Sequence, residues 1–224
     1  MLVPLAPGIW HAQRGFTVAG LAMTATMTVV QLADGGLWLH SPIQIDDALR
    51  AEIDAIGPVQ YVVAPNLVHH LFAKKCLELY PQARLFGAPG LHDKRPDLAP
   101  MTALAPEAPP EWRGQIDQVF MAGLPRVNET VFFHRASGSV VLTDVCQIWR
   151  GKLGWKESLF AHLTGVRNTL TVPRSIRLLV KDKAALRTSA LQVLAWPVTR
   201  VIVAHNSVVE QDAHAALTRA LGVV

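Results

Sequence analysis

The segment from Tyr61 to Phe72 constrains the fold of this chain more than any other. It reads Tyr-Val-Val-Ala-Pro-Asn-Leu-Val-His-His-Leu-Phe, so an apolar β-branched run ends at a Pro-Asn pair and two histidines follow it. This pattern is typical of a buried strand that carries imidazoles to the carboxyl end of a sheet, where open α/β sheets bind ligands. His69 and His70 are therefore candidate metal ligands or acid/base groups.

The length and composition predict one globular domain over residues 1–224. Half of the 224 residues are hydrophobic, which is enough for a sizeable core. The chain has only two cysteines, Cys76 and Cys146, and no Cys-x-x-Cys pair. This excludes a disulfide framework and a thiolate zinc site, and we expect a reducing, cytoplasmic setting.

The stretch from Gly15 to Ala33 carries no charge, so a membrane span or a signal peptide has to be considered. Its threonines and glycines and the Asp34-Gly35-Gly36 turn that follows favour strands instead. We expect neither a targeting segment nor an integral membrane segment.

Local patterns predict strands that alternate with helices along the chain. Strands are expected at residues 2–10, 27–32, 37–39, 59–64, 84–88, 116–121, 130–133, 139–143 and 200–204. Helices are expected from Asp46 or Asp47 to Ile56, and at 69–79, 182–196 and 210–221.

A basic section with interleaved tryptophans follows the middle strands. Residues 147–187 hold nine basic and two acidic side chains, whereas the whole chain has a net charge of +4. Residues 147–180, with Trp149 and Trp155, are expected to be partly helical. The section is interpreted as a solvated face, an oligomer contact, a lid over the site or a membrane-surface patch. Zinc-finger and RNP-like patterns are absent from the sequence, so no nucleic-acid partner is expected.

Five side chains stand where apolar runs end and the chain leaves the core. They are His69, His70, His134, Asp144 and His205. Imidazole and carboxylate donors of this kind suit zinc, iron or manganese. Asn66 either binds a water or a substrate carbonyl, or caps a helix.

These segments resemble the metallo-β-lactamase fold superfamily, and in particular a branch described as a domain of unknown function. The likeness includes the Gly-Gly hairpin, the His-bearing loop, the segment His134-Arg-Ala-Ser-Gly-Ser-Val-Val-Leu-Thr-Asp144 and the late strand that ends in His205. It implies an α/β fold, an αββα four-layer sandwich of two mixed sheets flanked by helices. It also implies that His134 is a terminal ligand, Asp144 a carboxylate that bridges two metals, and His205 the last ligand.

The first motif departs from the superfamily pattern. Where the superfamily reads His-x-His-x-Asp-His, this chain reads Pro65-Asn66-Leu67-Val68-His69-His70. Pro65 and Leu67 cannot bind a metal, whereas His70 keeps its position and His69 replaces the aspartate. We therefore expect at most one divalent metal, zinc or else iron or manganese, held by His69, His70, Asp144 and His205. In a second arrangement the loop shifts, and His69 and His70 join His134 instead.

The resemblance implies a metal-dependent hydrolase that acts on a small molecule through a metal-activated water. Its substrate would be an ester, lactone, thioester or phosphoester, with Asp144 or His69 accepting the proton of the water. The alternative is a catalytically degenerate member of the fold, which acts as a binding or oligomerisation module.

Overall fold

The computed structural model describes residues 1–18, 20–205 and 207–222. Strand residues form two sheets, and both of them are mixed. The first sheet has the order β1-β2-β3-β4-β5-β6-β7. Its strands are β1 (Val3–Ala6), β2 (Ile9–Val18), β3 (Leu21–Gln31), β4 (Leu37–His40), β5 (Val59–Ala64), β6 (Arg84–Gly87) and β7 (Met101–Ala103). Strands β1 to β4 pair antiparallel, and β4 to β7 pair parallel.

The second sheet has the order β12-β11-β10-β9-β8. Its strands are β8 (Ile116–Phe120), β9 (Thr130–His134), β10 (Ser139–Leu142), β11 (Arg200–Val203) and β12 (Val208–Val209). Strands β10 and β11 run parallel, whereas the other pairs are antiparallel. Parallel neighbours end at the same edge of a sheet, so the residues after β10 and β11 leave the core side by side.

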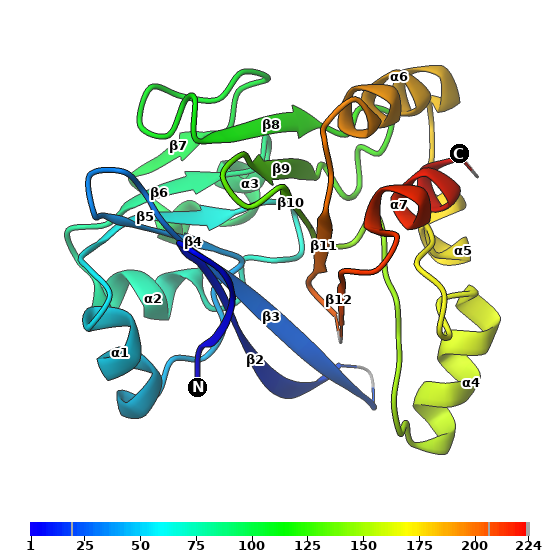
Figure 1. Cartoon of the computed structure of the whole chain (residues 1–224), viewed down its shortest axis with the longest axis horizontal. Helices are drawn as coiled ribbons and strands as arrows, with labels where there is room; N and C mark the ends of the chain where they lie inside the picture. The colour runs from blue at the N-terminus through cyan, green and yellow to red at the C-terminus, as the bar shows by residue number, and fades with distance from the viewer. Residues whose placement is uncertain (19, 206, 223–224) are drawn as a thin grey trace.

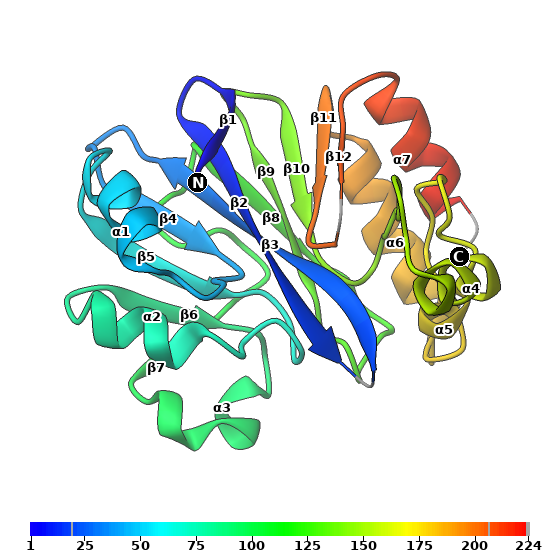
Figure 2. The ribbon, with the colours of Figure 1, turned by 90° about the horizontal axis from the view of Figure 1, so that it is seen from below.

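Helices cover the outer face of each sheet. They are α1 (Asp47–Asp54), α2 (Ala73–Leu79), α3 (Leu91–Lys94), α4 (Trp155–Thr164), α5 (Arg174–Arg177), α6 (Lys183–Leu194) and α7 (Ala213–Leu221), together with a short 3-10 turn at Pro96–Leu98. The apolar faces of α1 and α2 pack on the first sheet, and those of α6 and α7 pack on the second. Figure 2 shows the resulting succession of helices, sheet, sheet and helices. The predicted four-layer α/β sandwich is confirmed.

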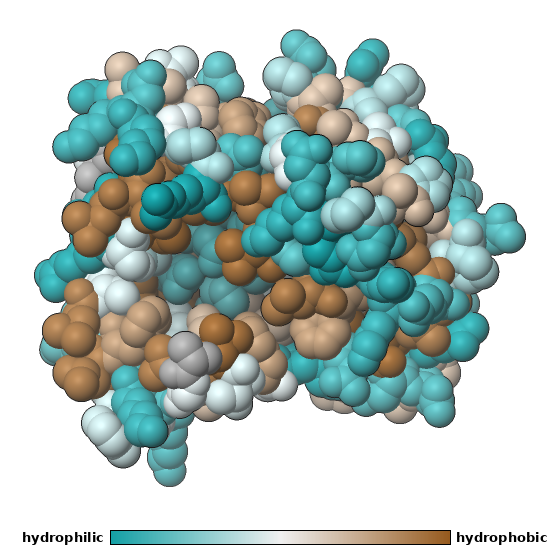
Figure 3. All heavy atoms as spheres, turned by 180° about the vertical axis from the view of Figure 1, so that it is seen from behind, coloured by the Kyte–Doolittle hydropathy of each residue, from teal (hydrophilic) through white to brown (hydrophobic). Residues whose placement is uncertain are grey.

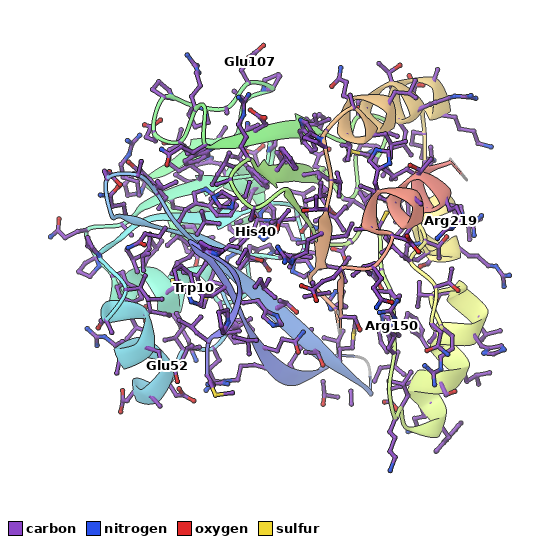
Figure 4. The ribbon with its side chains drawn as sticks, in the orientation of Figure 1. Trp10, His40, Glu52, Glu107, Arg150 and Arg219 are labelled. Atoms are coloured by element: carbon purple, nitrogen blue, oxygen red, sulfur yellow. The ribbon has the colours of Figure 1, made fainter. Side chains whose placement is uncertain are left out.

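The core between the sheets is rich in aromatic side chains. Trp38 of β4 makes edge-to-face contacts with Phe132 of β9 and with Trp112, at ring-centroid distances of 5.1 Å and 6.1 Å. His40 lies among them and is 1 % exposed, and Figure 4 shows it near the centre of the molecule. Burial lowers the pKa of His40 to about 3, so this imidazole is neutral.

Most strands and helices lie where the sequence predicts them, with one difference at the site. The uncharged stretch forms most of a long hairpin, β2 and β3, which projects from the first sheet (Figure 1). The helix expected from residue 69 begins only at Ala73, so that prediction was wrong for residues 69–72. Among the described residues, none forms a helix long and apolar enough to cross a membrane.

The basic section at 147–180 contains α4 and α5, and its two named aromatic residues differ in exposure. Trp149 is buried and packs on Phe160 with ring centroids 5.3 Å apart. Trp155 is 74 % exposed at the start of α4. The section contacts the β2–β3 hairpin, because the carboxylate of Glu157 accepts a hydrogen bond from the backbone N–H of Ala22.

Candidate metal centre

Three strand ends bring His69, Asp144 and His205 to one point. His69 lies in the loop after β5, Asp144 follows β10 and His205 follows β11. The Nε2 atom of His69 lies 3.4 Å from Oδ2 of Asp144, and Nε2 of His205 lies 3.5 Å from Oδ1 of the same carboxylate. One donor atom from each of the three residues lies within 4.8 Å of the other two. In the part of the chain that the structure describes, this is the one group of three such side chains that could share an ion.

The hydrogen bonds at the far side of each ring orient the histidines. Nδ1 of His205 lies 2.8 Å from the backbone carbonyl oxygen of Thr24. Because a carbonyl only accepts, a neutral His205 carries its proton on Nδ1 and its Nε2 lone pair faces Asp144. Nδ1 of His69 lies 2.8 Å from Oγ of Ser41, which allows the same tautomer. Partners of this kind are typical of metal-binding histidines.

The spacing of the donor atoms fits a first-row divalent ion. Zinc binds histidine nitrogen and carboxylate oxygen at about 2.0–2.2 Å, so two ligands at a tetrahedral angle lie about 3.4 Å apart. The two nitrogen–oxygen separations in the trio are 3.4 Å and 3.5 Å. Without a cation or a proton between them, two imidazole lone pairs would face an anionic carboxylate, which is unfavourable. The two nitrogens face different oxygens of Asp144, and the donor set fits the divalent metal that the fold implies.

A buried network holds Asp144 in place. Nδ2 of Asn66 donates to Oδ2 of Asp144 and to the hydroxyl of Thr143, both at 2.8 Å, while Nε2 of Gln147 lies 3.3 Å from Oδ1 of Asp144. The carboxylate of Glu129, which is fully buried, accepts the backbone N–H groups of Thr143, Asp144 and Val145 at 2.6–3.0 Å.

Asn66 joins this network to the histidine loop. Its Oδ1 accepts the backbone N–H groups of Val68 and His69 at 2.8 Å and 2.7 Å, which closes a turn before the histidine. The backbone carbonyl of Pro65 accepts from Thr130, so this loop is fixed to the second sheet. Of the two roles expected for Asn66, the structure shows backbone capping, in a turn rather than at a helix.

The electrostatics of the trio favour an ionised Asp144. Burial alone would raise its pKa, but the imidazoles of His69 and His205 hold the pKa of Asp144 well below its usual range. Burial disfavours the charged form of His69, yet Asp144 and Glu129 together raise the pKa of this imidazole. Burial and the nearby Asp144 carboxylate raise the pKa of Glu129. A cation in the trio would compete with a proton on His69.

Ser41 occupies an unusual backbone conformation beside His69. Its φ is 53°, in the left-handed region that residues other than glycine seldom adopt, and its side chain is buried. The backbone N–H of Ser41 donates to Val63 of the neighbouring strand, which fixes the turn after β4. Conformations of this kind concentrate at functional sites.

The structure does not bring His70 into the trio. Its Nδ1 lies 2.8 Å from a guanidinium nitrogen of Arg95, which can only donate. A neutral His70 that accepts this hydrogen bond carries its proton on Nε2 and has no lone pair left for a metal. Burial and the charges of Lys94 and Arg95 lower the pKa of His70. Because Asn66 closes the turn before it, His69 faces Asp144 and His70 turns toward Arg95.

The structure also leaves His134 away from Asp144. His134 is the last residue of β9 and pairs with Ser139 at the first position of β10, whereas Asp144 follows the other end of β10. Strand β10, with a rise of about 3.3 Å per residue, separates the two positions by about 10 Å or more. Nδ1 of His134 is hydrogen-bonded to Ser137 at 2.8 Å instead. The residue at the same end of the hairpin as Asp144 is Glu129.

A cavity of about 370 Å³ opens beside the trio, and His69, Asp144 and His205 all lie in its wall. This volume is within the range of small-molecule sites. A second cavity of about 400 Å³ also reaches His205 and is lined in part by Trp149 and Lys152 of the basic section. A larger one, about 550 Å³, lies between α2, β6 and β7 and includes none of the trio.

The three residues of the trio are among the five candidate ligands that the sequence predicted, but three residues that position them were missed: Ser41, Glu129 and Gln147. An acidic residue directly before the apolar run of β9 was the available signal for Glu129, since a strand start is usually the edge of the core. Ser41 and Gln147 carry no comparable signal, because a serine or glutamine beside a strand is usually at the surface.

Comparison with family models identifies the chain. A model described as a domain of unknown function, DUF4336, matches residues 7–150, more than half of the sequence. The chain belongs to this family. The matched region of the DUF4336 domain contains His69 and Asp144 but ends before His205.

Solved structures share the fold of this DUF4336 chain. A metallo-β-lactamase from Pontibacter korlensis matches with a TM-score of 0.68 at 11 % identity, covering 99 % of this chain and 98 % of that one. The mono-zinc form of the metallo-β-lactamase FIM-1 from Pseudomonas aeruginosa matches with a TM-score of 0.66 at 10 % identity, covering 100 % and 95 %. The metal-soaked flavodiiron core of Flv1 from Synechocystis sp. PCC6803 matches with a TM-score of 0.68 at 14 % identity, covering 100 % and 60 %.

These likenesses confirm the metallo-β-lactamase fold that the sequence predicted. Identities of 10–14 % establish the fold and leave the activity to be argued from the site. No curated protein matches the chain in sequence.

Proposed function

We propose that this DUF4336 protein is a metal-dependent hydrolase with one divalent metal, zinc, held by His69, Asp144 and His205. The observation that supports this proposal most strongly is the pair of nitrogen–oxygen separations, 3.4 Å and 3.5 Å, between oriented imidazoles and one carboxylate. Iron and manganese accept the same donors and are the alternative metals.

The chemistry proposed for the site divides between the metal and the protein. When bound, a divalent cation polarises a carbonyl or phosphoryl oxygen and lowers the pKa of a coordinated water. Asp144 is ionised at neutral pH, and we assign it to accept the proton of an attacking water because its carboxylate lies at the trio; its depressed pKa makes it a weak base for this step. His69 is the second candidate for this role, but only when it does not bind the metal, because its Nδ1 is hydrogen-bonded to Ser41 and its Nε2 faces Asp144.

The remaining residues prepare the site before a substrate arrives. Glu129 accepts the backbone N–H of Asp144 and Asn66 donates to its carboxylate, so this carboxylate needs no reorganisation during the reaction. Substrates compatible with this chemistry are esters, lactones, thioesters and phosphoesters.

One observation favours a second candidate function, a binding module without catalysis. Pro65 and Leu67 stand where the superfamily places two ligands of a first metal, and neither side chain has a donor atom. A protein with only the trio could hold a metal structurally and bind a small molecule in the cavity.

Metal content and hydrolysis, measured on the same preparation, test the proposal. We expect about one equivalent of a transition metal in protein purified without chelator, and less than about a tenth of an equivalent in His205→Ala. Hydrolysis of a panel of aryl esters, lactones, thioesters and phosphodiesters should disappear with EDTA and return with zinc. His92→Ala, which changes an exposed histidine outside the trio, is the control.

The outcomes separate the two candidates. A metal-free wild-type protein, or hydrolysis that EDTA leaves unchanged, contradicts a metal-dependent hydrolase. One equivalent of metal with no hydrolysis of any substrate in the panel supports the binding module.

A further inference from the structure

The wall of the 370 Å³ cavity beside the trio is mostly apolar. Phe16, Met23, Ala25, Pro42, Leu71 and Phe72 contribute to it. Phe16 also stacks on the ring of His205, with centroids 6.5 Å apart and an angle of 28° between the planes. The apolar wall therefore reaches the edge of the candidate metal centre.

Other polar groups in this wall already have partners within the protein. Oγ of Ser41 is bonded to His69, Nδ1 of His70 is paired with Arg95, and the ammonium of Lys94 donates to the backbone carbonyl of Leu67 at 2.6 Å. A charged or strongly polar ligand would lose its hydration in this cavity and gain few hydrogen bonds in return. An apolar group has no hydrogen bonds to water to lose, and it gains contact with the apolar wall.

The mouth of the cavity is also apolar. Val18, Val68 and Leu71 belong to its lining and are nevertheless 45–57 % exposed. Figure 3, which shows the face opposite to that of Figure 1, has a hollow bordered by both hydrophobic and hydrophilic side chains. Exposed apolar residues that border a cavity often mark a place where an apolar ligand enters.

We infer that the cavity holds the acyl group of the substrate, and that the substrates are esters or thioesters of apolar carboxylic acids. This inference rests on the proposed function, because the ester carbonyl would lie at the trio while the acyl chain fills the cavity. It goes beyond that function by excluding small polar and phosphorylated acyl groups.

Binding of unreactive alcohols tests the cavity without any hydrolysis. Titration calorimetry with 1-butanol, 1-hexanol and 1-octanol should show that Kd falls about fourfold for each added methylene, the gain expected for burying a CH₂ group. A Kd that is independent of chain length contradicts the inference.

A matched pair of variants locates the binding. Leu71→Asp places a charge at the cavity mouth, where Leu71 is 57 % exposed, and should weaken 1-octanol binding at least fivefold. Leu191→Asp makes the same change on α6, outside the cavity lining, where Leu191 is 61 % exposed, and should leave Kd unchanged. Because both positions are exposed, both variants should fold, and Val68→Asp provides a second change at the mouth. Equal weakening by Leu71→Asp and Leu191→Asp contradicts the assignment.

Ester hydrolysis separates failure of this inference from failure of the proposed function. With p-nitrophenyl acetate, butyrate and octanoate, we expect kcat/KM to rise with chain length in the wild type and less steeply in Leu71→Asp. Hydrolysis that does not depend on chain length contradicts the assignment of the cavity to the acyl group, but it is consistent with the proposed hydrolase function. Chain-length-dependent binding without hydrolysis overturns the hydrolase and leaves the ligand class of the cavity standing.

Discussion

Asp144 shows how much of the candidate site depends on single side chains. Its two oxygens face different histidines, and Asn66 and Gln147 donate to them from behind. Asp144→Asn keeps the shape but replaces one oxygen with an amide nitrogen and removes the negative charge. We expect zinc affinity to fall at least 100-fold, measured by competition with a chelating dye. Asp93→Asn, at an exposed carboxylate, should leave the affinity unchanged.

Glu129 has a positioning role that can be tested by stability. Glu129→Gln replaces one acceptor oxygen with a donor amide facing backbone N–H groups that are buried. We expect a loss of about 2–3 kcal/mol in the free energy of unfolding, the cost of leaving such groups unpaired. Urea denaturation measures it, with Glu107→Gln at an exposed position as the control (Figure 4). Equal stability of the two variants would show that the network is unimportant.

His69 gives the metal-free protein a pH dependence with a definite sign. Its pKa is raised by Asp144, so the stabilisation that it contributes is complete below its unfolded pKa and is lost as the pH rises through the folded value. The depressed pKa of Asp144 makes its own contribution complete above its unfolded pKa. In EDTA, the difference in unfolding free energy between wild type and His69→Gln should therefore be larger at pH 5.5 than at pH 8.5.

Because His40 is present in both the wild type and His69→Gln, the difference in their unfolding free energies reports the pH dependence of His69. His40 has a pKa lowered to about 3, so its stabilisation is lost as the pH falls below its unfolded value, the opposite sign. Zinc binding requires a deprotonated His69, and zinc affinity should rise with pH. An equal difference at both pH values contradicts the His69–Asp144 pairing.

At the scale of elements, the turn after β5 decides which histidine reaches Asp144. The sequence predicts a helix from residue 69, but the side chain of Asn66 accepts two backbone N–H groups and delays α2 to Ala73. A local side-chain hydrogen bond of this kind competes with helix formation and is hard to infer from periodicity. This is why the trio uses His69, whereas the sequence placed His70 at the retained ligand position and His69 in place of the aspartate.

The hairpin between β9 and β10 explains why His134, a predicted ligand, lies away from Asp144. Residues 134–144 contain a His, a turn and an Asp in the expected order, yet the turn lies directly after His134, so the whole of β10 separates it from Asp144. Residue order along a hairpin does not specify which end of the sheet a side chain occupies. The sequence predicted each strand, but the pairing that places Glu129 beside Asp144 depends on tertiary register.

Variants of Asn66 test the role of the turn after β5. Asn66→Ala removes the donor to Asp144 and the acceptor for two backbone N–H groups, and should cost about 2–3 kcal/mol of unfolding free energy. Asn66→Asp keeps the acceptor but adds a carboxylate beside Glu129 and Asp144, so its loss should be larger at pH 8 than at pH 5. Chemical denaturation at both pH values gives the answer. A loss for Asn66→Asp that does not change with pH would contradict the proposed carboxylate crowding.

At the scale of the whole molecule, the site exists because two sheets are held face to face. His69 comes from the first sheet, whereas Asp144 and His205 come from the second. The buried aromatic contacts of Trp38 with Phe132 and Trp112 lie between the sheets. Apolar patterns predicted the individual strands and helices, whereas the layered architecture was implied only by the family resemblance. The sequence could not predict that the donor atoms of His69, Asp144 and His205 converge, because their positions depend on how the two sheets pack.

Removing this aromatic contact should weaken the fold as a whole. Trp38→Ala should lower the free energy of unfolding by about 3–5 kcal/mol, as expected for a large cavity in a core. Trp155→Ala removes the same side chain from a position that is 74 % exposed, and should change it by less than about 0.5 kcal/mol. Thermal and urea unfolding would measure both. Similar losses for the two variants would contradict the assignment of the inter-sheet core.

The central claim is that His69, Asp144 and His205 bind one metal ion together. Crystals grown with zinc and measured on both sides of the zinc absorption edge test it most directly. The prediction is one anomalous peak about 2.0–2.2 Å from Nε2 of His69, Nε2 of His205 and an oxygen of Asp144. No peak at this point, or a peak bound through His70 or His134 instead, would contradict the claim.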